Sequence, residues 1–315
     1  MKNDDLYIYS FYRFIHIKEK KNIKYLLDKY FKTIVLRGTI LIANEGINAS
    51  ISGTEKDLLD TISLIKKLLK IRKLNIKINK NKFLPFNRIK VRLKKEIVSL
   101  GKGEIDVNKF TGNLIHPSKW NDIIEKKDVT LIDTRNTYEI DIGQFQGAIN
   151  LETDNFRQFP SKIKKIGIKK NDKIAMYCTG GIRCEKASAY LKLNGFKNVV
   201  QLDGGILNYF NYIKNKKKEK LWMGECFVFD NRVTVNSNLN KGKYMQCHGC
   251  RHPITKNDTK LKSFKKGVSC KYCYNKRSKN QKNRSAVRQN QINIAEKVGA
   301  IHTFKSIKSK DILGA

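Results

Sequence analysis

One six-residue segment carries the residue types best suited to chemistry: Cys178, Thr179, Gly180, Gly181, Ile182 and Arg183. It follows an apolar run at residues 174–177 and precedes a stretch whose apolar residues have helical spacing. The two glycines let the backbone curl so that several N–H groups point inward, and the start of a helix adds positive potential. Such a cradle stabilises a thiolate, a persulfide or a bound oxyanion, so we expect a lowered pKa for Cys178. Arg183 is placed to bind an anion or to brace the loop.

A buried, inert cysteine beside a tight turn is the alternative explanation for Cys178. The loop length, the glycine pair and the arginine favour a catalytic cysteine that acts as a nucleophile or carries a persulfide. Cys184 directly follows the loop, and we interpret it as the start of the helix rather than as a disulfide partner. Arg135 and Glu139 are expected to brace the sheet, and a place for Arg135 in the lining of the pocket is the alternative.

Two C-x-x-C pairs, 247-CHGC-250 and 270-CKYC-273, are separated by nineteen residues, a spacing typical of a structural zinc site. The predicted metal ligands are Cys247, Cys250, Cys270 and Cys273. Four thiolates complete the tetrahedral coordination of Zn²⁺ and leave no open position for catalysis. A redox dithiol, or the exchange of one thiolate for His248 or His252, is the alternative. Zinc is expected to hold together a segment that is too small to fold on its own core.

A basic segment without acidic residues follows the second cysteine pair. Its cationic side chains are Lys276, Arg277, Lys279, Lys282, Arg284 and Arg288. A solvated tail would explain them without function. Their place directly after a zinc module favours an arm that contacts the phosphates of a nucleic acid.

The bulk composition agrees with a nucleic-acid partner. The chain has 315 residues, with 65 Lys and Arg against 28 Asp and Glu, which gives a formal net charge of +37. Such a charge attracts polyanions, although a bias towards Lys, Asn and Ile accounts for part of it. We expect no membrane span and no signal peptide. The seven cysteines fit a reducing compartment, so we expect a cytoplasmic protein.

The chain length and the alternation of segments predict an α/β multidomain protein. Residues 1–100 have strand and helix signals in β-α-β-β-α-β order, which predicts a ferredoxin-like (acylphosphatase-like) α+β domain. Residues 115–215 contain short buried strands at 129–133, 174–177 and 199–202, which predict a parallel α/β sheet with Cys178 at a strand end. Residues 220–290 form the expected four-cysteine module, and 291–315 a basic C-terminal tail.

The sequence around Cys178 resembles the rhodanese family. A cysteine loop of this length closed by arginine, an early 131-LIDTRNTYEIDIGQFQGAIN-150 segment and a late 202-LDGGILNY-209 segment carry the resemblance. Over residues 6–290 the chain is similar to bacterial rhodanese-related tRNA uridine hydroxylases, on the segments 43-ANEGINASISG-53 and 222-WMGECFVFDNRV-233 and the zinc knuckles. This resemblance implies oxygen-dependent conversion of the wobble uridine in a tRNA anticodon loop to 5-hydroxyuridine. The essential cysteine of the family falls on Cys178.

The residues themselves show no flavin or nicotinamide motif, and the five histidines form no HxD or HxE pair for iron. Molecular oxygen is then a co-substrate whose electron source the sequence leaves open. Two other functions fit parts of the chain. A rhodanese-type sulfurtransferase would carry a persulfide on Cys178, and a non-catalytic RNA-binding zinc protein would keep the rhodanese fold as a relic.

Overall fold

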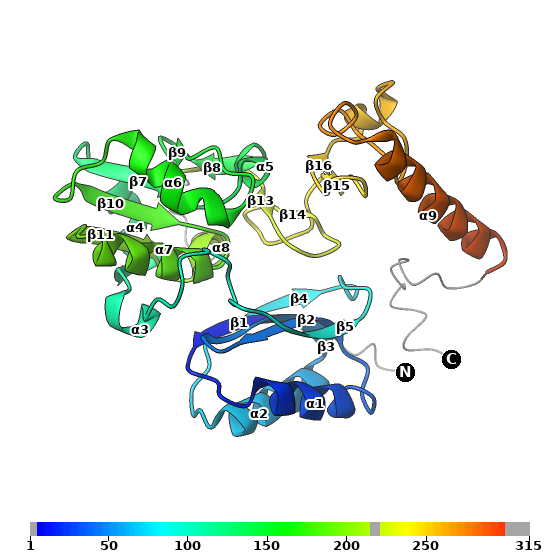
Figure 1. Ribbon diagram of the computed structural model, residues 1–315, viewed down its shortest axis with the longest axis horizontal. Helices are drawn as coiled ribbons and strands as arrows, with labels where there is room; N and C mark the ends of the chain where they lie inside the picture. The colour runs from blue at the N-terminus through cyan, green and yellow to red at the C-terminus, as the bar shows by residue number, and fades with distance from the viewer. Residues whose placement is uncertain (1–4, 215–220, 300–315) are drawn as a thin grey trace.

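The computed structural model describes residues 5–214 and 221–299, and these residues form three successive parts (Figure 1). An N-terminal sheet with two helices lies beside a parallel α/β sheet, and a small module with a long helix follows. Within the described residues, no helix is both long and apolar enough to cross a bilayer.

The N-terminal part has the following elements: β1 (Leu6–Phe14), α1 (Lys20–Tyr30), β2 (Arg37–Ala43), β3 (Gly46–Thr54), α2 (Glu55–Leu69), β4 (Ile76–Asn81) and β5 (Ile89–Leu93). The strands lie in the order β4-β1-β3-β2-β5. The predicted β-α-β-β-α-β order is confirmed, and the last strand, β5, pairs in parallel with β2. Both helices cover one face of this sheet (Figure 1).

Alternation of side chains gives the N-terminal sheet two different faces. Tyr9 and Phe11 of β1 pack into a core with α1 and α2, where Leu58 and Ile65 are buried. The alternate residues of β1, such as Ser10 and Tyr12, point to the opposite face. There Tyr12 and its neighbours on β3 and β4 meet the middle part of the chain. The face that α1 and α2 leave free is therefore the one that contacts the middle part of the chain.

The middle part contains these strands and helices: α3 (Val107–Phe110), β6 (Asn113–Ile115), α4 (Pro117–Ile124), β7 (Val129–Asp133), α5 (Thr137–Ile140), β8 (Gly143–Phe145), β9 (Ile149–Asn150), η1 (Phe156–Gln158), α6 (Phe159–Ile163), η2 (Lys164–Ile166), β10 (Lys173–Tyr177), α7 (Ile182–Leu193), β11 (Asn198–Leu202) and α8 (Gly205–Lys214). Its main sheet is parallel, in the order β6-β11-β10-β7-β9. Strands predicted at 129–133, 174–177 and 199–202 are confirmed to within one residue.

The segment after the 215–220 gap packs onto the middle part rather than onto the cysteine module. It forms the short strands β12 (Trp222–Gly224), β13 (Cys226–Phe227) and β14 (Thr234–Val235). β12 pairs with β8, and the Trp222 ring lies edge-on to Phe145 at 5.2 Å between centroids. Trp222, Cys226 and Val228 share a buried core with Tyr177. The boundary expected at residue 220 therefore lies before a segment that completes the core of the middle part.

The C-terminal part contains β15 (Met245–Gln246), β16 (Pro253–Ile254), η3 (Asn257–Lys260) and α9 (Lys279–Lys297). Ser278 and Gln281 cap α9 reciprocally, which fixes where the helix begins. The helix continues through residue 290, so the boundary expected there falls inside one helix. Residues 300–315 of the expected tail lie outside the described residues.

Buried ionic contacts join the first two parts. Lys186 of α7 is fully buried, and its Nζ lies 2.6 Å from a carboxylate oxygen of both Glu45 and Glu96. It also donates to the carbonyl oxygen of Val98 at 3.1 Å. Two carboxylates balance a cation that is otherwise costly to bury, so the contact favours one relative orientation of the two parts.

Candidate active site and metal cluster

The structure places Cys178 directly after β10, at the carboxyl end of the parallel sheet. Helix α7 begins at Ile182, so the six-residue loop leads into its positive N-terminal end. Gly181 has a φ of +99°, a backbone conformation that favours glycine. In this conformation the Gly181 N–H donates to Cys178 Sγ at 3.0 Å.

Helix α8 holds the loop from the other side. The N–H of Ile206 donates to the Cys178 carbonyl at 2.9 Å, and the N–H of Leu207 donates to the Thr179 carbonyl at 3.2 Å. A Cβ atom on Gly205 would lie 2.4 Å from the Cys178 carbonyl oxygen, so only glycine allows this approach. The Gly204–Gly205 pair of the late motif is thus explained by close packing of α8 on the loop.

The surroundings of Cys178 favour its thiolate. Burial by itself raises the pKa of a thiol, and Cys178 is only 1% exposed. A hydrogen bond from the Cys184 thiol, the charge of Arg183, and the N–H groups of Cys184 and Gly181 outweigh that effect and lower the pKa to about 5. Cys178 is therefore ionised at neutral pH, in the direction expected from the glycine loop.

Cys184 acts as a protonated neighbour of this thiolate. Burial and the negative charge on Cys178 raise the pKa of Cys184 well above its usual value. Its sulfur also lies 3.4 Å from the Thr134 hydroxyl. A thiol that stays protonated can donate to Cys178, so Cys184 has a supporting contact in addition to its place in the first turn of α7.

Arg183 is braced by an acidic partner. Its two terminal nitrogens each donate to one carboxylate oxygen of Glu139 at 2.7 Å, and both side chains are buried. This bidentate pair fixes the plane of the guanidinium and leaves its charge close to Cys178. The pKa of Arg183 is raised, because the nearby Glu139 charge outweighs the effect of burial.

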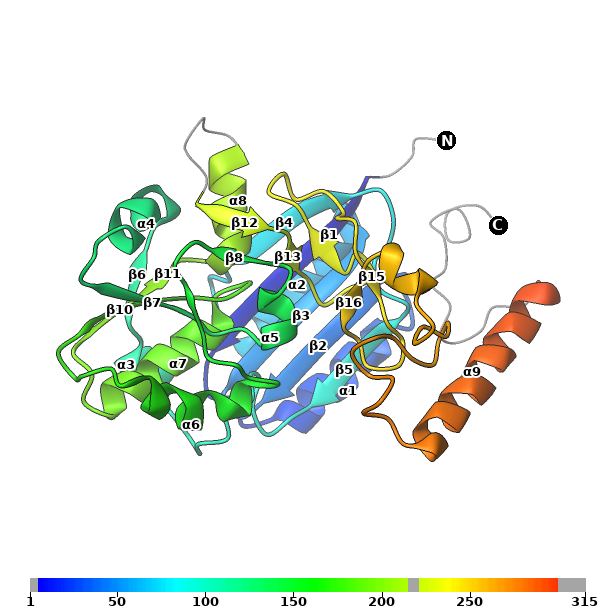
Figure 2. The same ribbon diagram turned by 90° about the horizontal axis from the view of Figure 1, so that it is seen from above.

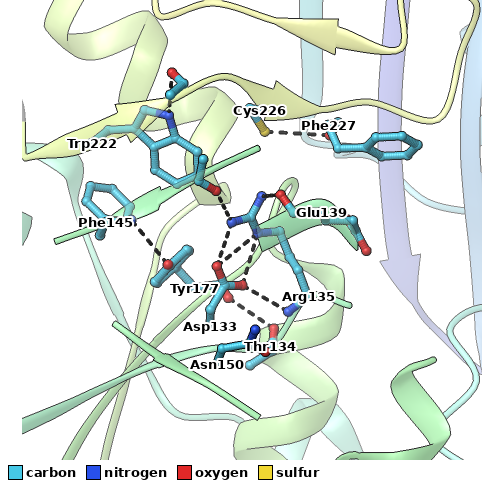
Figure 3. A network of polar contacts seen from close by, with 12 residues as sticks. Asp133, Thr134, Arg135, Glu139, Phe145, Asn150, Tyr177, Trp222, Cys226 and Phe227 are labelled. Carbon is cyan, nitrogen blue, oxygen red and sulfur yellow. Dashed lines mark hydrogen bonds and ion pairs between the residues drawn. The ribbon is translucent and has the colours of Figure 1, made fainter. Parts of the chain in front are cut away.

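A second buried arginine, Arg135, contacts the backbone of Glu139 (Figure 3). Arg135 is fully buried and contacts both carboxylate oxygens of Asp133, with its Nη2 at 2.6 Å from Oδ2. It also donates to the carbonyl oxygens of Glu139 at 3.1 Å and Gly143 at 2.7 Å. With every terminal nitrogen engaged, Arg135 supports the backbone of Glu139, as the bracing interpretation predicts.

The remaining loop residues contact other segments of the chain. Thr179 is buried beside Cys226, and burial raises the pKa of that second thiol to about 12. Ile182 is half-buried. The Gly180 carbonyl accepts a hydrogen bond from Lys77 of β4, which lies more than 100 residues away in the sequence.

The N-terminal sheet thus contributes residues that the sequence pattern does not single out. Lys77 Nζ also donates to the Gly204 carbonyl at 2.6 Å, so it bridges the two glycine turns around the loop. Burial lowers its pKa to about 8 although Cys178 and other anions favour its charge. Tyr12 donates to Glu185 of α7 at 2.6 Å. Their only sequence signal is a polar residue alternating with apolar ones along a strand.

The four predicted metal ligands come together. The sulfur atoms of Cys247, Cys250, Cys270 and Cys273 all lie within 4.8 Å of one another. The Cys250–Cys270 and Cys270–Cys273 sulfur distances are 3.7 Å and 3.9 Å. Zn–S bonds of about 2.3 Å in a tetrahedron require sulfurs about 3.8 Å apart, so the cluster fits this ion.

Both histidines of this region lie outside the sulfur cluster. His248 is exposed, and its backbone carbonyl accepts from Arg288 at 3.0 Å. His252 stacks on Tyr272 at 4.8 Å between ring centroids. The candidate metal site in the described residues therefore consists of the four cysteines without either histidine.

The six predicted basic residues divide into two groups. Arg277 donates to the Val268 carbonyl at 2.6 Å and to the Ser285 hydroxyl at 2.9 Å. Arg288 donates to the carbonyl oxygens of His248 and Gly267. These two arginines therefore hold α9 on the cysteine module. The other four lie at the start of α9 or just before it: Lys276, Lys279, Lys282 and Arg284.

Two domain families match separate parts of the chain. The UPF0176 acylphosphatase-like domain matches residues 6–97, and the rhodanese-like domain matches residues 116–211. Solved structures similar to the chain include a rhodanese-related protein from Thermoplasma volcanium, with 24% identity and a TM-score of 0.26. The match covers 32% of this chain and 92% of the Thermoplasma protein. A rhodanese-like domain protein from Staphylococcus aureus has 25% identity and a TM-score of 0.26, covering 31% and 90%.

A relative is similar over nearly the whole length. The protein from Pelagibacter ubique (strain HTCC1062) named tRNA uridine(34) hydroxylase is 48% identical over 299 residues. The match covers 95% of this chain and 98% of the relative, so it includes the N-terminal sheet, the cysteine loop and the cysteine pairs. The chain belongs to the tRNA uridine(34) hydroxylase family.

Proposed function

We propose that this protein hydroxylates C5 of uridine 34 in tRNA, with molecular oxygen as co-substrate and Cys178 as the reacting group. The observation that carries the proposal is the ionised Cys178 in a loop of inward N–H groups, in a chain that belongs to this hydroxylase family. The protein is then an oxidoreductase that acts on RNA, and its substrate places it in the cytoplasm.

The proposed reaction begins with addition of the Cys178 thiolate to C6 of uracil. A new S–C6 bond forms, and the electron pair of the C5–C6 double bond moves onto C5 and the O4 enolate. The electron-rich C5 then takes up one oxygen atom as a hydroxyl group. Loss of the C5 proton reforms the double bond and expels the Cys178 thiolate, which regenerates the enzyme.

The second atom of the oxygen molecule must be reduced. One O₂, two electrons and two protons convert uridine to 5-hydroxyuridine and one water, so the proposal requires an external two-electron reductant. Zinc held by four thiolates is redox-inert and has no open position. In the cluster of Cys247, Cys250, Cys270 and Cys273 it would hold the C-terminal module together.

The substrate must reach a buried sulfur. Cys178 is 1% exposed, and Lys77 crosses from the N-terminal sheet to the carbonyl oxygens on either side of the loop. Because the sulfur is buried, residues around the loop must move before a uridine can reach it. An anticodon loop suits this path, because its bases are already partly unstacked and cost little to extrude.

Oxygen-isotope labelling tests the proposed function. The host lacks its own uridine 34 hydroxylases, expresses this chain and grows under oxygen-18 gas. We expect its tRNA to contain 5-hydroxyuridine with one heavy oxygen atom. The same host under ordinary oxygen gives the unlabelled nucleoside, and without the chain gives none. Absence of 5-hydroxyuridine, together with turnover of thiosulfate by the purified protein, would instead identify a sulfurtransferase.

A further inference from the structure

An exposed aromatic ring lies beside the Cys178 loop. Phe229 is 65% exposed, and the Arg183 guanidinium carbon lies 5.8 Å from the centre of its ring. The edge of the ring contacts Phe227 at 5.1 Å between centroids. Phe229 therefore presents most of its apolar surface to solvent next to the arginine that closes the loop.

The turn that follows Phe229 is held rigidly. Arg232 and Asp230 form a bidentate pair, with 2.6 Å between Nη2 and Oδ2, and both side chains are buried. The N–H of Asn231 donates to the Pro85 carbonyl at 2.8 Å, and its side-chain amide donates to Asn87 at 2.8 Å. An exposed ring on such a fixed turn is preorganised for contact with a ligand.

The Asn231 contacts lead directly to a row of cations. The basic stripe consists of Arg88, directly before β5, and of Lys90 and Arg92 on β5. These residues alternate with Ile89 and Val91, which pack towards α1 and α2. The stripe therefore lies on the face of the N-terminal sheet that the helices leave uncovered. Both views place the β13–β14 hairpin over this face (Figures 1 and 2).

Arg251 of the cysteine module adds a fourth cation next to the basic stripe. Burial and the like charges of Arg88, Arg92 and Arg251 lower the pKa of Lys90. Within residues 5–214 and 221–299, none of these four side chains forms an ion pair with an acidic residue. Like charges that lie together without acidic partners repel one another unless an anion binds between them.

We propose that Phe229, the basic stripe and Arg251 form a track for single-stranded RNA that leads to the Cys178 loop. Phe229 stacks on a base of the substrate, and the cations contact the backbone phosphates of the adjoining nucleotides. An aromatic platform beside a cationic row is the arrangement that binds single strands without reading their sequence. The inference rests on the proposed function, because it takes RNA to be the substrate of the loop.

Binding of a fluorescently labelled seven-nucleotide RNA with one central uridine tests the aromatic platform. We expect F229A to weaken binding by about tenfold or more, because stacking on one aromatic side chain contributes substantially to single-strand affinity. F229W should bind as the unchanged protein does. Tyr25 of α1 is equally exposed at 65% but lies in the helix layer, so Y25A is the matched control. Equal affinities of F229A and Y25A would overturn the role of Phe229.

The salt dependence of the same binding tests the cations. Replacing all three residues of the basic stripe with alanine should lower the slope of log K against log salt by about 2, since each phosphate contact on a single strand contributes about 0.7. The control replaces Lys21, Lys29 and Lys67, three exposed lysines of α1 and α2, and should leave the slope unchanged. Equal slopes for the two triple variants would overturn the proposed phosphate contacts.

These outcomes are separate from the test of the proposed function. RNA binding that depends on Phe229 and the stripe, in a protein that makes no 5-hydroxyuridine, would support the track and overturn the hydroxylase activity. Labelled 5-hydroxyuridine made by a protein whose F229A and stripe variants bind RNA unchanged would support the activity and overturn the track.

Discussion

Replacing Cys270 with serine is expected to release the metal and to unfold the C-terminal module. The four cysteine sulfurs lie within 4.8 Å of one another, and Cys270 is fully buried. Apart from these cysteines, the module has only a small apolar core. Structural zinc binds small peptide modules with about 10–16 kcal/mol of apparent free energy. That is as large as the whole stability of a typical domain, about 5–15 kcal/mol, so the module cannot fold without the ion.

Metal content and limited proteolysis measure this effect. We expect one zinc per chain in the unchanged protein, and none in C270S, whose exposed lysines beyond residue 255 become sites of rapid trypsin cleavage. The H248A variant is the matched control, since His248 is exposed beside the cluster but supplies no ligand in the structure. Loss of zinc from H248A, or full retention in C270S, would contradict the four-cysteine assignment.

Replacing Arg183 with alanine is expected to destabilise the protein by about 3–5 kcal/mol, because Glu139 then keeps a buried, unpaired carboxylate. Chemical denaturation measures the change. The control is K173A, which breaks an ion pair between Lys173 and Asp128 whose side chains are both more than half exposed. An exposed pair contributes about 0–1 kcal/mol, so K173A should be nearly neutral. Similar losses in the two variants would contradict the buried bidentate pair.

The same arginine should also govern the ionisation of Cys178. Its positive charge is one of the groups that lower the pKa of Cys178 to about 5, so R183Q should shift the titration to higher pH. The sign follows from the charge, because removing a cation disfavours the thiolate and leaves more protonated thiol at a given pH. The ultraviolet absorbance of the thiolate, taken as a difference from C178S, reports the midpoint. An unchanged midpoint in R183Q would show that Arg183 acts on the loop only as a brace.

Local patterns in the sequence predict the individual parts well. The apolar run at residues 174–177 ends just before Cys178 and the two glycines, and this pattern predicts the end of β10 and the position of Cys178 directly after it. The two C-x-x-C pairs fix their own ligand geometry, because each knuckle brings two sulfurs together within a few residues. The ferredoxin-like order likewise follows from periodicity within residues 1–100, whereas the order of the strands in the sheet does not.

Contacts between the parts could not be predicted in the same way. Lys77 and Tyr12 reach the cysteine loop only because the uncovered face of one sheet packs against another domain, and no local spacing encodes that packing. The segment from Trp222 to Val235 looks like the start of the cysteine module, yet Trp222, Cys226 and Val228 pack into the core of the preceding domain. Phe229 gains its place beside Arg183 through this packing.

The central claim is that Cys178 itself reacts with the uridine. Nucleoside mass spectrometry on tRNA from the same hydroxylase-deficient host, expressing either C178S or C184S, tests it most directly. We expect C178S to lose at least roughly a thousandfold in product, as when a catalytic nucleophile is removed. C184S keeps a hydroxyl donor beside Cys178 and should retain 5-hydroxyuridine. Normal 5-hydroxyuridine in the C178S host would contradict the account, because the loop would then not hold the reacting group.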